Sequence, residues 1–180
     1  SEQGTSSSHM AATKFMDALA RCPGNHGEDS DAIGAYTQVK LAEVEKLLGK
    51  GNVMIATWVS LPRYLWPQSW KDKNYENPYV PLWVNLYGHK LAGLLWQKWS
   101  EDKIINKCGF EKVQGWECLY VHKRKQVFLS VYVDDLKMAG KKENLGPMWK
   151  ELRKHMAPDP PVKMVENQYL GSVSYTHLTL

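Results

Sequence analysis

Two adjacent carboxylates, Asp134 and Asp135, follow an apolar run and are the residues of this chain best suited to chemistry. The preceding residues 127–133 are mostly β-branched and aromatic, which predicts a buried strand. Residues 136–139 predict the return strand, closed by Gly140. Carboxylates held rigidly at a hairpin tip can bind divalent metal ions, which activate a hydroxyl and stabilise a leaving phosphate. The alternative is a plain turn, because Asp is favoured in turns.

Three further segments contain short motifs, and their order along the chain makes them stronger evidence than any one motif alone. Asp31-Ala32-Ile33-Gly34-Ala35-Tyr36 has the form D-x-x-x-A-aromatic. Residues 85–96 contain the arrangement L-Y-G-x-K-x-A-x-x-x-W, formed by Leu86, Tyr87, Gly88, Lys90, Ala92 and Trp96. Tyr169-Leu170-Gly171 comes last. One short acidic motif is weak evidence, whereas four segments in a fixed order are much stronger evidence.

In this order the segments resemble the reverse transcriptase of copia-type LTR retrotransposons, over residues 1–171. The resemblance implies an α+β fold, namely the polymerase palm (an antiparallel sheet backed by helices) with part of the fingers. It implies an RNA-directed DNA polymerase fragment of a retrotransposon polyprotein, which transfers deoxynucleotides to a primer 3′-hydroxyl by two-metal chemistry. Residues 172–180 look like a translated sequencing adapter, so we expect them to be a non-native tail.

The resemblance also implies residue roles. The implied catalytic and metal-binding residues are Asp31, Asp134 and Asp135. The implied nucleotide-binding residues are Ala32, Tyr36, Tyr87, Gly88 and Lys163, with the Tyr36 ring excluding a 2′-hydroxyl. The expected contacts to nucleic acid are Lys90, Lys123, Arg124 and Lys125. The implied cofactor is a pair of Mg²⁺ ions, with Mn²⁺ as the alternative, because hard cations prefer carboxylate oxygens.

Charge and composition fit these expectations. The net charge is +4, and it is unevenly distributed. Residues 1–60 hold five Lys/Arg and seven Asp/Glu, so the basic excess lies in the remainder. A basic portion beside an acidic metal site suits a polyphosphate or nucleic-acid partner. The resemblance implies an RNA or DNA template with its primer, deoxynucleoside triphosphates and the rest of the polyprotein as partners. No apolar run reaches membrane-spanning length, so we expect no membrane contact. The resemblance implies an intracellular location, in a cytoplasmic virus-like particle or the nucleus.

Two alternatives stay open. His89, Leu91 and Gly93 depart from the family pattern, which favours a decayed, inactive remnant acting at most as a nucleic-acid-binding module. Residues 27–30 are polar where the family has an apolar strand, which makes Asp29 a rival metal ligand. The other alternative is an unrelated α+β protein. Even as a polymerase, we expect the isolated fragment to be inactive, because fingers, thumb and ribonuclease H segments lie outside it.

The remaining patterns predict the supporting elements. Apolar stripes predict helices at residues 10–20, 35–48, 91–108 and 147–156, with Pro147 at the first helical position. Strands are predicted at 53–61, 117–122 and 126–133, and a loop at 62–84. Three cysteines without C-x-x-C spacing predict reduced thiols. Within the loop, Trp66 or Trp70 is a candidate for stacking on a base, with core packing as the alternative.

Overall fold

The computed structural model describes residues 7–49, 57–164, 168–169 and 172–173. It divides into unit 1, formed by residues 1–35 and 96–180, and unit 2, formed by residues 36–95. Residues 53–56 of a predicted strand, Leu170, Gly171 and residues 174–180 of the expected tail lie outside the described residues. Short strands β9 (Gln168–Tyr169) and β10 (Ser172–Val173) pair with each other.

Unit 1 is built on a six-stranded antiparallel sheet with the order β4-β5-β6-β7-β1-β8. In this order the strands are Glu111–Lys112, Leu119–His122, Val127–Tyr132, Asp135–Lys141, Asn25–Asp31 and Val162–Lys163. The predicted β6–β7 hairpin is confirmed. Its return strand is longer than predicted, and Gly140 lies inside it rather than closing it. A Cβ at Gly140 would clash with the backbone of Gln126 and Val127, so close strand packing requires glycine here.

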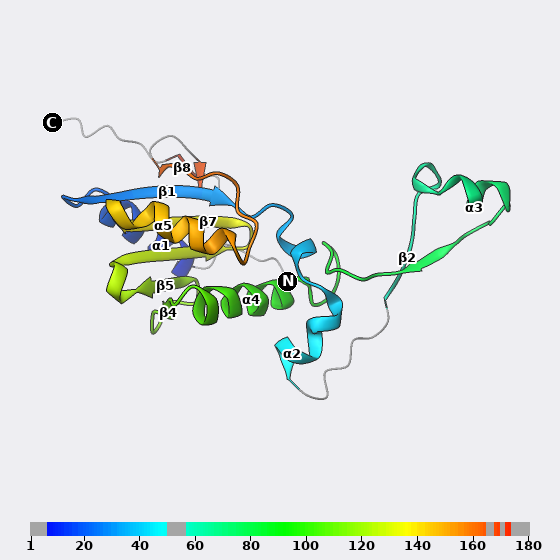
Figure 1. Cartoon of the computed structure of the whole chain (residues 1–180), viewed down its shortest axis with the longest axis horizontal. Coiled ribbons are helices and arrows are strands. Elements are labelled where there is room, and N and C mark those ends of the chain that lie inside the picture. The colour runs from blue at the N-terminus through cyan, green and yellow to red at the C-terminus, as the bar shows by residue number, and fades with distance from the viewer. Residues whose placement is uncertain (1–6, 50–56, 165–167, 170–171, 174–180) are drawn as a thin grey trace. The chain divides into compact units, whose positions relative to one another are not determined.

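Helices α1 (Ser7–Ala20) and α5 (Lys142–Arg153) cover opposite faces of this sheet (Figure 1). Under α1, Met16 packs with Leu119, Ala139 and Met164 in a buried apolar cluster. The predicted helices at 10–20 and 147–156 are confirmed in kind, but α5 begins earlier than predicted. Pro147 therefore lies inside α5, and its predicted place at the first helical position is wrong.

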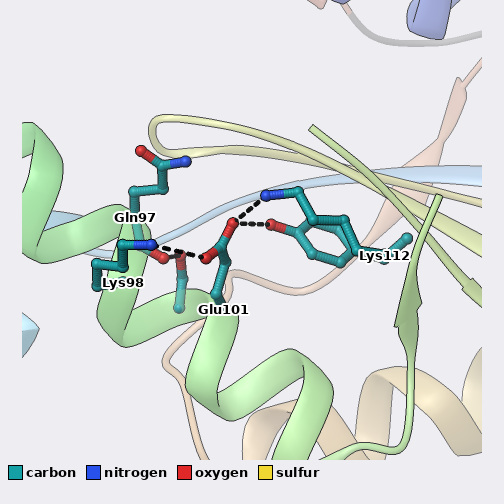
Figure 2. Close-up of polar contacts among 6 residues, drawn as sticks. Gln97, Lys98, Glu101 and Lys112 are labelled. Carbon is teal, nitrogen blue, oxygen red and sulfur yellow. Dashed lines mark hydrogen bonds and ion pairs between the residues drawn. The ribbon is translucent and has the colours of Figure 1, made fainter. Parts of the chain in front are cut away.

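Helix α4 (Ala92–Asp102) continues as a π-helical turn, Lys103–Lys107, in place of one uniform helix to residue 108. Within unit 1, Glu101 of α4 ties this helix to the sheet (Figure 2). Its carboxylate accepts hydrogen bonds from Lys112 Nζ at 2.6 Å and from the Tyr120 hydroxyl at 3.3 Å. Lys98 Nζ lies 3.8 Å from the same carboxylate. Burial raises the pKa of the Tyr120 hydroxyl, so it stays a donor at neutral pH.

The predicted helix at 35–48 is wrong as a continuous element. It is divided into 3-10 turns at Ala35–Gln38 and Leu41–Glu43 and the short helix α2 (Val44–Leu48). The interruption is Lys40, which has extended backbone and forms a β-bridge with Val84. A pairing partner this far along the chain is invisible to a local apolar pattern.

The predicted loop at 62–84 contains regular structure. A 3-10 turn (Arg63–Leu65) and helix α3 (Gln68–Asp72) lie between strands β2 (Trp58–Ser60) and β3 (Tyr79–Pro81), which form an antiparallel hairpin. This β2–β3 hairpin with its insertion is the main feature of unit 2.

Candidate functional site

The two acidic segments meet at one end of the unit 1 sheet. Asp31 is the last residue of β1, Asp135 is the first of β7, and their Cα atoms are register partners across the antiparallel ladder. Side chains directly opposite each other have Cβ atoms about 4.5–5.5 Å apart, and like charges in such a pair destabilise the sheet. Asp134 occupies the adjoining turn, and both Asp31 and Asp134 are exposed. This end of the sheet therefore concentrates negative charge next to solvent.

The turn that carries Asp134 has an unusual backbone. Val133 has a φ of +52° in the tight connection between β6 and β7. A β-branched residue rarely adopts this conformation, which costs on the order of 1–3 kcal/mol and persists only where neighbouring structure enforces it. Two hydrogen bonds do so: Trp96 Nε1 donates to the Val133 carbonyl at 2.5 Å, and the Ala32 N–H donates to the Asp134 carbonyl at 2.6 Å.

The end of β1 is fixed by the segment that follows α5. The Asp159 N–H donates to the Asp31 carbonyl at 2.8 Å, and the Ser30 hydroxyl donates to the Asp159 carbonyl at 2.7 Å. Ala32 forms a β-bridge with Pro158. The backbone on both sides of the Asp31 carboxylate is therefore held in place. Although residues 27–30 are polar, they belong to β1, a seven-residue strand paired on both sides that ends at Asp31.

A buried charge network explains how so polar a sequence forms an inner strand. Lys137 is fully buried, and its ammonium lies 2.9 Å from Asp17 Oδ1 of α1 and 3.7 Å from Asp29 Oδ1 of β1. Asp29 and Lys137 are direct register partners. Strand alternation puts them on the same sheet face as Asp31 and Asp135, one side-chain position further along. The sequence analysis named Asp29 as a rival metal ligand. In the structure its carboxylate lies next to the buried ammonium of Lys137, which favours a structural role for Asp29.

Asp29 provides a pH-dependent prediction. Burial, opposed by the charge of Lys137, raises the pKa of Asp29 from 3.8 to about 6. Unfolded Asp29 loses its proton at lower pH than folded Asp29, so stability is greatest in acid and declines as pH rises through about 6. We expect this residue to remove about 2 kcal/mol from the free energy of unfolding between pH 4 and pH 7.

Urea unfolding at a series of pH values, in chelator, checks this prediction. Asp29→Asn should flatten the decline, whereas Asp72→Asn, at an exposed site, should leave it unchanged. An equally steep decline in Asp29→Asn would assign the pH dependence to other groups.

The acidic end offers the type of donor that a hard divalent cation prefers, but not a complete set of ligands. Its donors are carboxylate oxygens, and Mg²⁺ in polyphosphate enzymes takes one or two carboxylates plus substrate phosphates and water. In the described residues, no three His, Cys, Asp or Glu side chains form a group that could hold a metal by themselves. The described carboxylates of this end could therefore supply only part of the ligands of a metal ion.

The residues expected to bind a nucleotide lie in different places. Ala32 is buried beside the Asp134 turn. In unit 2, the rings of Tyr36 and Tyr87 pack with centroids 4.3 Å apart, which unites two members of the set. Gly88 has a φ of +87°, a conformation that favours glycine. Lys163 of β8 is opposite Glu28, on the sheet face away from Asp31, so its nucleotide role stays a prediction.

Three of the basic residues expected to contact nucleic acid lie in unit 1, away from its acidic end. Lys123, Arg124 and Lys125 form the turn between β5 and β6. This turn is at the other end of β6 from Asp134, a strand length of about 20 Å. Lys123 Nζ is paired with Glu111 at 2.5 Å. Lys90 is exposed in unit 2. These nucleic-acid contacts also stay predictions.

Trp96 is the supporting residue that sequence reasoning placed only as a motif match. It is buried and stacked on Trp99, with ring centroids 5.6 Å apart and an interplanar angle of 26°. Its single N–H is used on the Val133 carbonyl, so this residue helps define the shape of the acidic turn. The available signal was its place in the segment with Tyr87 and Gly88, but that pattern did not reveal the bond.

Comparison with known proteins finds a partial match. The chain is 37% identical over 65 residues to the Transposon Ty1-DR4 Gag-Pol polyprotein and to the Transposon TyH3 Gag-Pol polyprotein, both of Saccharomyces cerevisiae. The Truncated transposon Ty1-A Gag-Pol polyprotein of the same yeast is equally similar over the same length. The shared segment is 36% of this chain and 4–5% of these polyproteins. This similarity to a retrotransposon Gag-Pol polyprotein supports a retroelement-derived fragment.

No protein-family model matches the chain, and no solved structure matches it. In the described part of the chain, no helix combines the length and the apolar character that crossing a bilayer requires.

Proposed function

We propose that this chain is part of an RNA-directed DNA polymerase encoded by a copia-type retrotransposon, comprising the palm and part of the fingers. The observation that carries the proposal is the meeting of Asp31 with Asp135, beside Asp134, at one end of an antiparallel sheet. These residues belong to segments far apart in sequence that resemble the two acidic motifs of that family. The similarity to transposon Gag-Pol polyproteins supports the same origin.

In this proposal Asp31, Asp134 and Asp135 hold two divalent metal ions together with the phosphates of the incoming nucleotide. The bound metal would activate the primer 3′-hydroxyl and stabilise the departing pyrophosphate. The backbone that carries these carboxylates is held by the Trp96 bond to the turn and the Asp159 bond to β1. Rigid placement is the main contribution that a protein makes to phosphoryl transfer.

The direct test is primer extension. The chain, joined to the flanking segments of its own polyprotein, should extend a DNA primer on an RNA template with deoxynucleotides and Mg²⁺, and should stop when the metal is chelated. A folded joined protein that binds primer–template yet never extends it would instead support the decayed, nucleic-acid-binding remnant.

Tyr36 provides a prediction about sugar selection. By resemblance, its ring excludes the 2′-hydroxyl, and its packing on Tyr87 at 4.3 Å holds the ring in one position. Tyr36→Val should raise the ratio of ribonucleotide to deoxynucleotide kcat/KM by at least about tenfold, equivalent to about 1.4 kcal/mol. Tyr36→Phe keeps the ring and should keep the discrimination. An unchanged ratio in Tyr36→Val would leave Tyr36 as a packing residue.

A further inference from the structure

Unit 2 contains a cleft that none of the roles above uses. It has a volume of about 500 Å³ and opens between the two loops that flank α3. Trp66 and Tyr75 supply aromatic surface, and the polar side chains around them are Arg63, Asn74, Glu76 and Asn77. Its volume falls in the range of small-ligand pockets, and its lining is more polar than apolar and open to solvent. We call it the hairpin cleft.

The aromatic part of the hairpin cleft is held in place from within. Trp66 is buried, and its Nε1 donates to the Leu61 carbonyl at 2.7 Å. Edge-to-face contacts continue from Trp66 to Trp70 at 6.4 Å and from Trp70 to Tyr75 at 6.5 Å. Burial of Trp66 favours the core-packing alternative for this ring, and stacking by Trp70 stays a prediction. Tyr75, which is 46% exposed, is the ring of the cleft that a ligand can reach.

The cleft also holds a cation at its rim. The Arg63 guanidinium carbon lies 5.8 Å from the centroid of the Trp66 ring, a cation–π arrangement. Among the described residues, no carboxylate lies within ion-pair distance of Arg63. An exposed guanidinium supported by an aromatic ring is well placed to accept a phosphate.

Exposed rings continue from the cleft along the hairpin. Ser60, which lines the cleft, is the register partner of Tyr79, and Trp58 is two residues before Ser60 on the same face. Trp58 and Tyr79 are 58% and 62% exposed. Diagonal neighbours on adjacent strands are about 7–8 Å apart, within the reach of aromatic rings. The exposed rings of the hairpin face and the cleft therefore meet at Ser60, and we call the two together the aromatic surface.

We propose that this surface binds single-stranded RNA or DNA, with one base in the hairpin cleft against Tyr75, neighbouring bases on Trp58 and Tyr79, and a phosphate at Arg63. Every base has a π-face, so a row of aromatic rings beside a cation suits a single strand. Glu76 can accept a hydrogen bond from an exocyclic amino group, and Asn74 and Asn77 offer both donors and acceptors, which favours cytosine or adenine in the cleft.

The proposal is independent of the polymerase chemistry, because it uses none of the carboxylates of unit 1. It is tested on the 180-residue chain with a fluorescein-labelled (AC)₆ RNA, by fluorescence anisotropy at low salt. Tyr75→Ala and Trp58→Ala should each raise the Kd by about 5- to 100-fold, the effect of losing one stacked base. Tyr75→Phe keeps the ring and should bind as wild type does.

Tyr64→Ala is the matched control. Tyr64 is 79% exposed in the same unit but does not line the cleft, so its loss should leave the Kd unchanged. Arg63→Ala should reduce the slope of log Kd against log salt by about 0.7, as expected for one phosphate contact to a single strand. The anisotropy measurement needs neither Mg²⁺ nor deoxynucleotides, so a failed polymerase proposal and a failed binding proposal give different results.

Three outcomes would overturn the proposal. One is the absence of saturable RNA binding by the wild-type chain. Another is a Kd in Tyr75→Ala and Trp58→Ala equal to that of wild type. The third is a loss in Tyr64→Ala as large as in those variants. Saturable binding of a proline-rich peptide without RNA binding would reassign the aromatic surface to a protein partner.

Discussion

Asp31→Asn is expected to slow primer extension by the joined polymerase by more than about 100-fold. Loss of even a residue that only orients a metal ligand costs 10- to 100-fold in affinity or activity, and loss of a ligand should cost more. The substitution keeps the size of the side chain and its backbone pairing with Asp135, and it removes only one negative charge. Single-turnover extension at several Mg²⁺ concentrations measures the effect.

Asp159→Asn is the matched control for this prediction. Asp159 is exposed, and it contacts Asp31 through its backbone N–H, so its substitution removes a neighbouring charge without disturbing the bond. Extension by Asp159→Asn should stay close to wild type. Wild-type extension by Asp31→Asn would refute the polymerase proposal, and equal losses in both variants would attribute the effect to net charge.

Asp31→Asn should leave the fold intact and raise its free energy of unfolding slightly. Asp31 and Asp135 are like charges directly opposite each other, an arrangement that costs a sheet up to about 1 kcal/mol. Loss of activity with a small gain in stability is typical when a functional charge is substituted. Substitution of a residue that supports the fold lowers the free energy of unfolding instead.

Lys137→Met is expected to lower the free energy of unfolding by about 3–5 kcal/mol at pH 7. Lys137 is fully buried between Asp17 and Asp29, and removing one partner from a buried ion pair leaves an uncompensated charge inside the protein. The double variant Lys137→Met with Asp29→Asn should lose less free energy of unfolding than Lys137→Met alone, because it also removes the buried carboxylate of Asp29. Urea unfolding followed by tryptophan fluorescence measures both.

Lys112→Met is the control for burial. Lys112 makes a shorter ion pair, 2.6 Å to Glu101, but its side chain is 40% exposed (Figure 2). Glu101 is only 14% exposed, but it keeps Lys98 and the Tyr120 hydroxyl as partners. This variant should therefore lose about 1 kcal/mol, far less than Lys137→Met. Equal destabilisation by the two substitutions would show that burial does not determine the value of these pairs.

The contrast between β6 and β1 shows what the sequence could predict. β6 has a β-branched, aromatic composition and was predicted from it. β1, with the sequence NHGEDSD, has no such pattern. It can still form an inner strand because the charge of Asp29 is compensated by Lys137, on a strand more than a hundred residues later. That compensation becomes visible only once the register is known.

The candidate site divides in the same way. Resemblance to a family selected Asp31, Asp134 and Asp135, and the structure brings them to one end of a sheet. Resemblance did not reveal that Asp135 rather than Asp134 is opposite Asp31. Nor did it reveal the left-handed backbone of Val133 or the Trp96 bond that supports it, because both depend on tertiary packing.

The two outer strands of the six-stranded sheet affect how the chain behaves at high concentration. β4 and β8 are each two residues long, each contains a lysine, and Pro160 and Pro161 immediately precede β8. Short, charged edges, one of them preceded by prolines, offer few consecutive backbone groups to a second molecule, and proteins use such edges to prevent strand-to-strand aggregation. The described sheet therefore resists self-association through its edges, a property that favours work with this chain in concentrated solution.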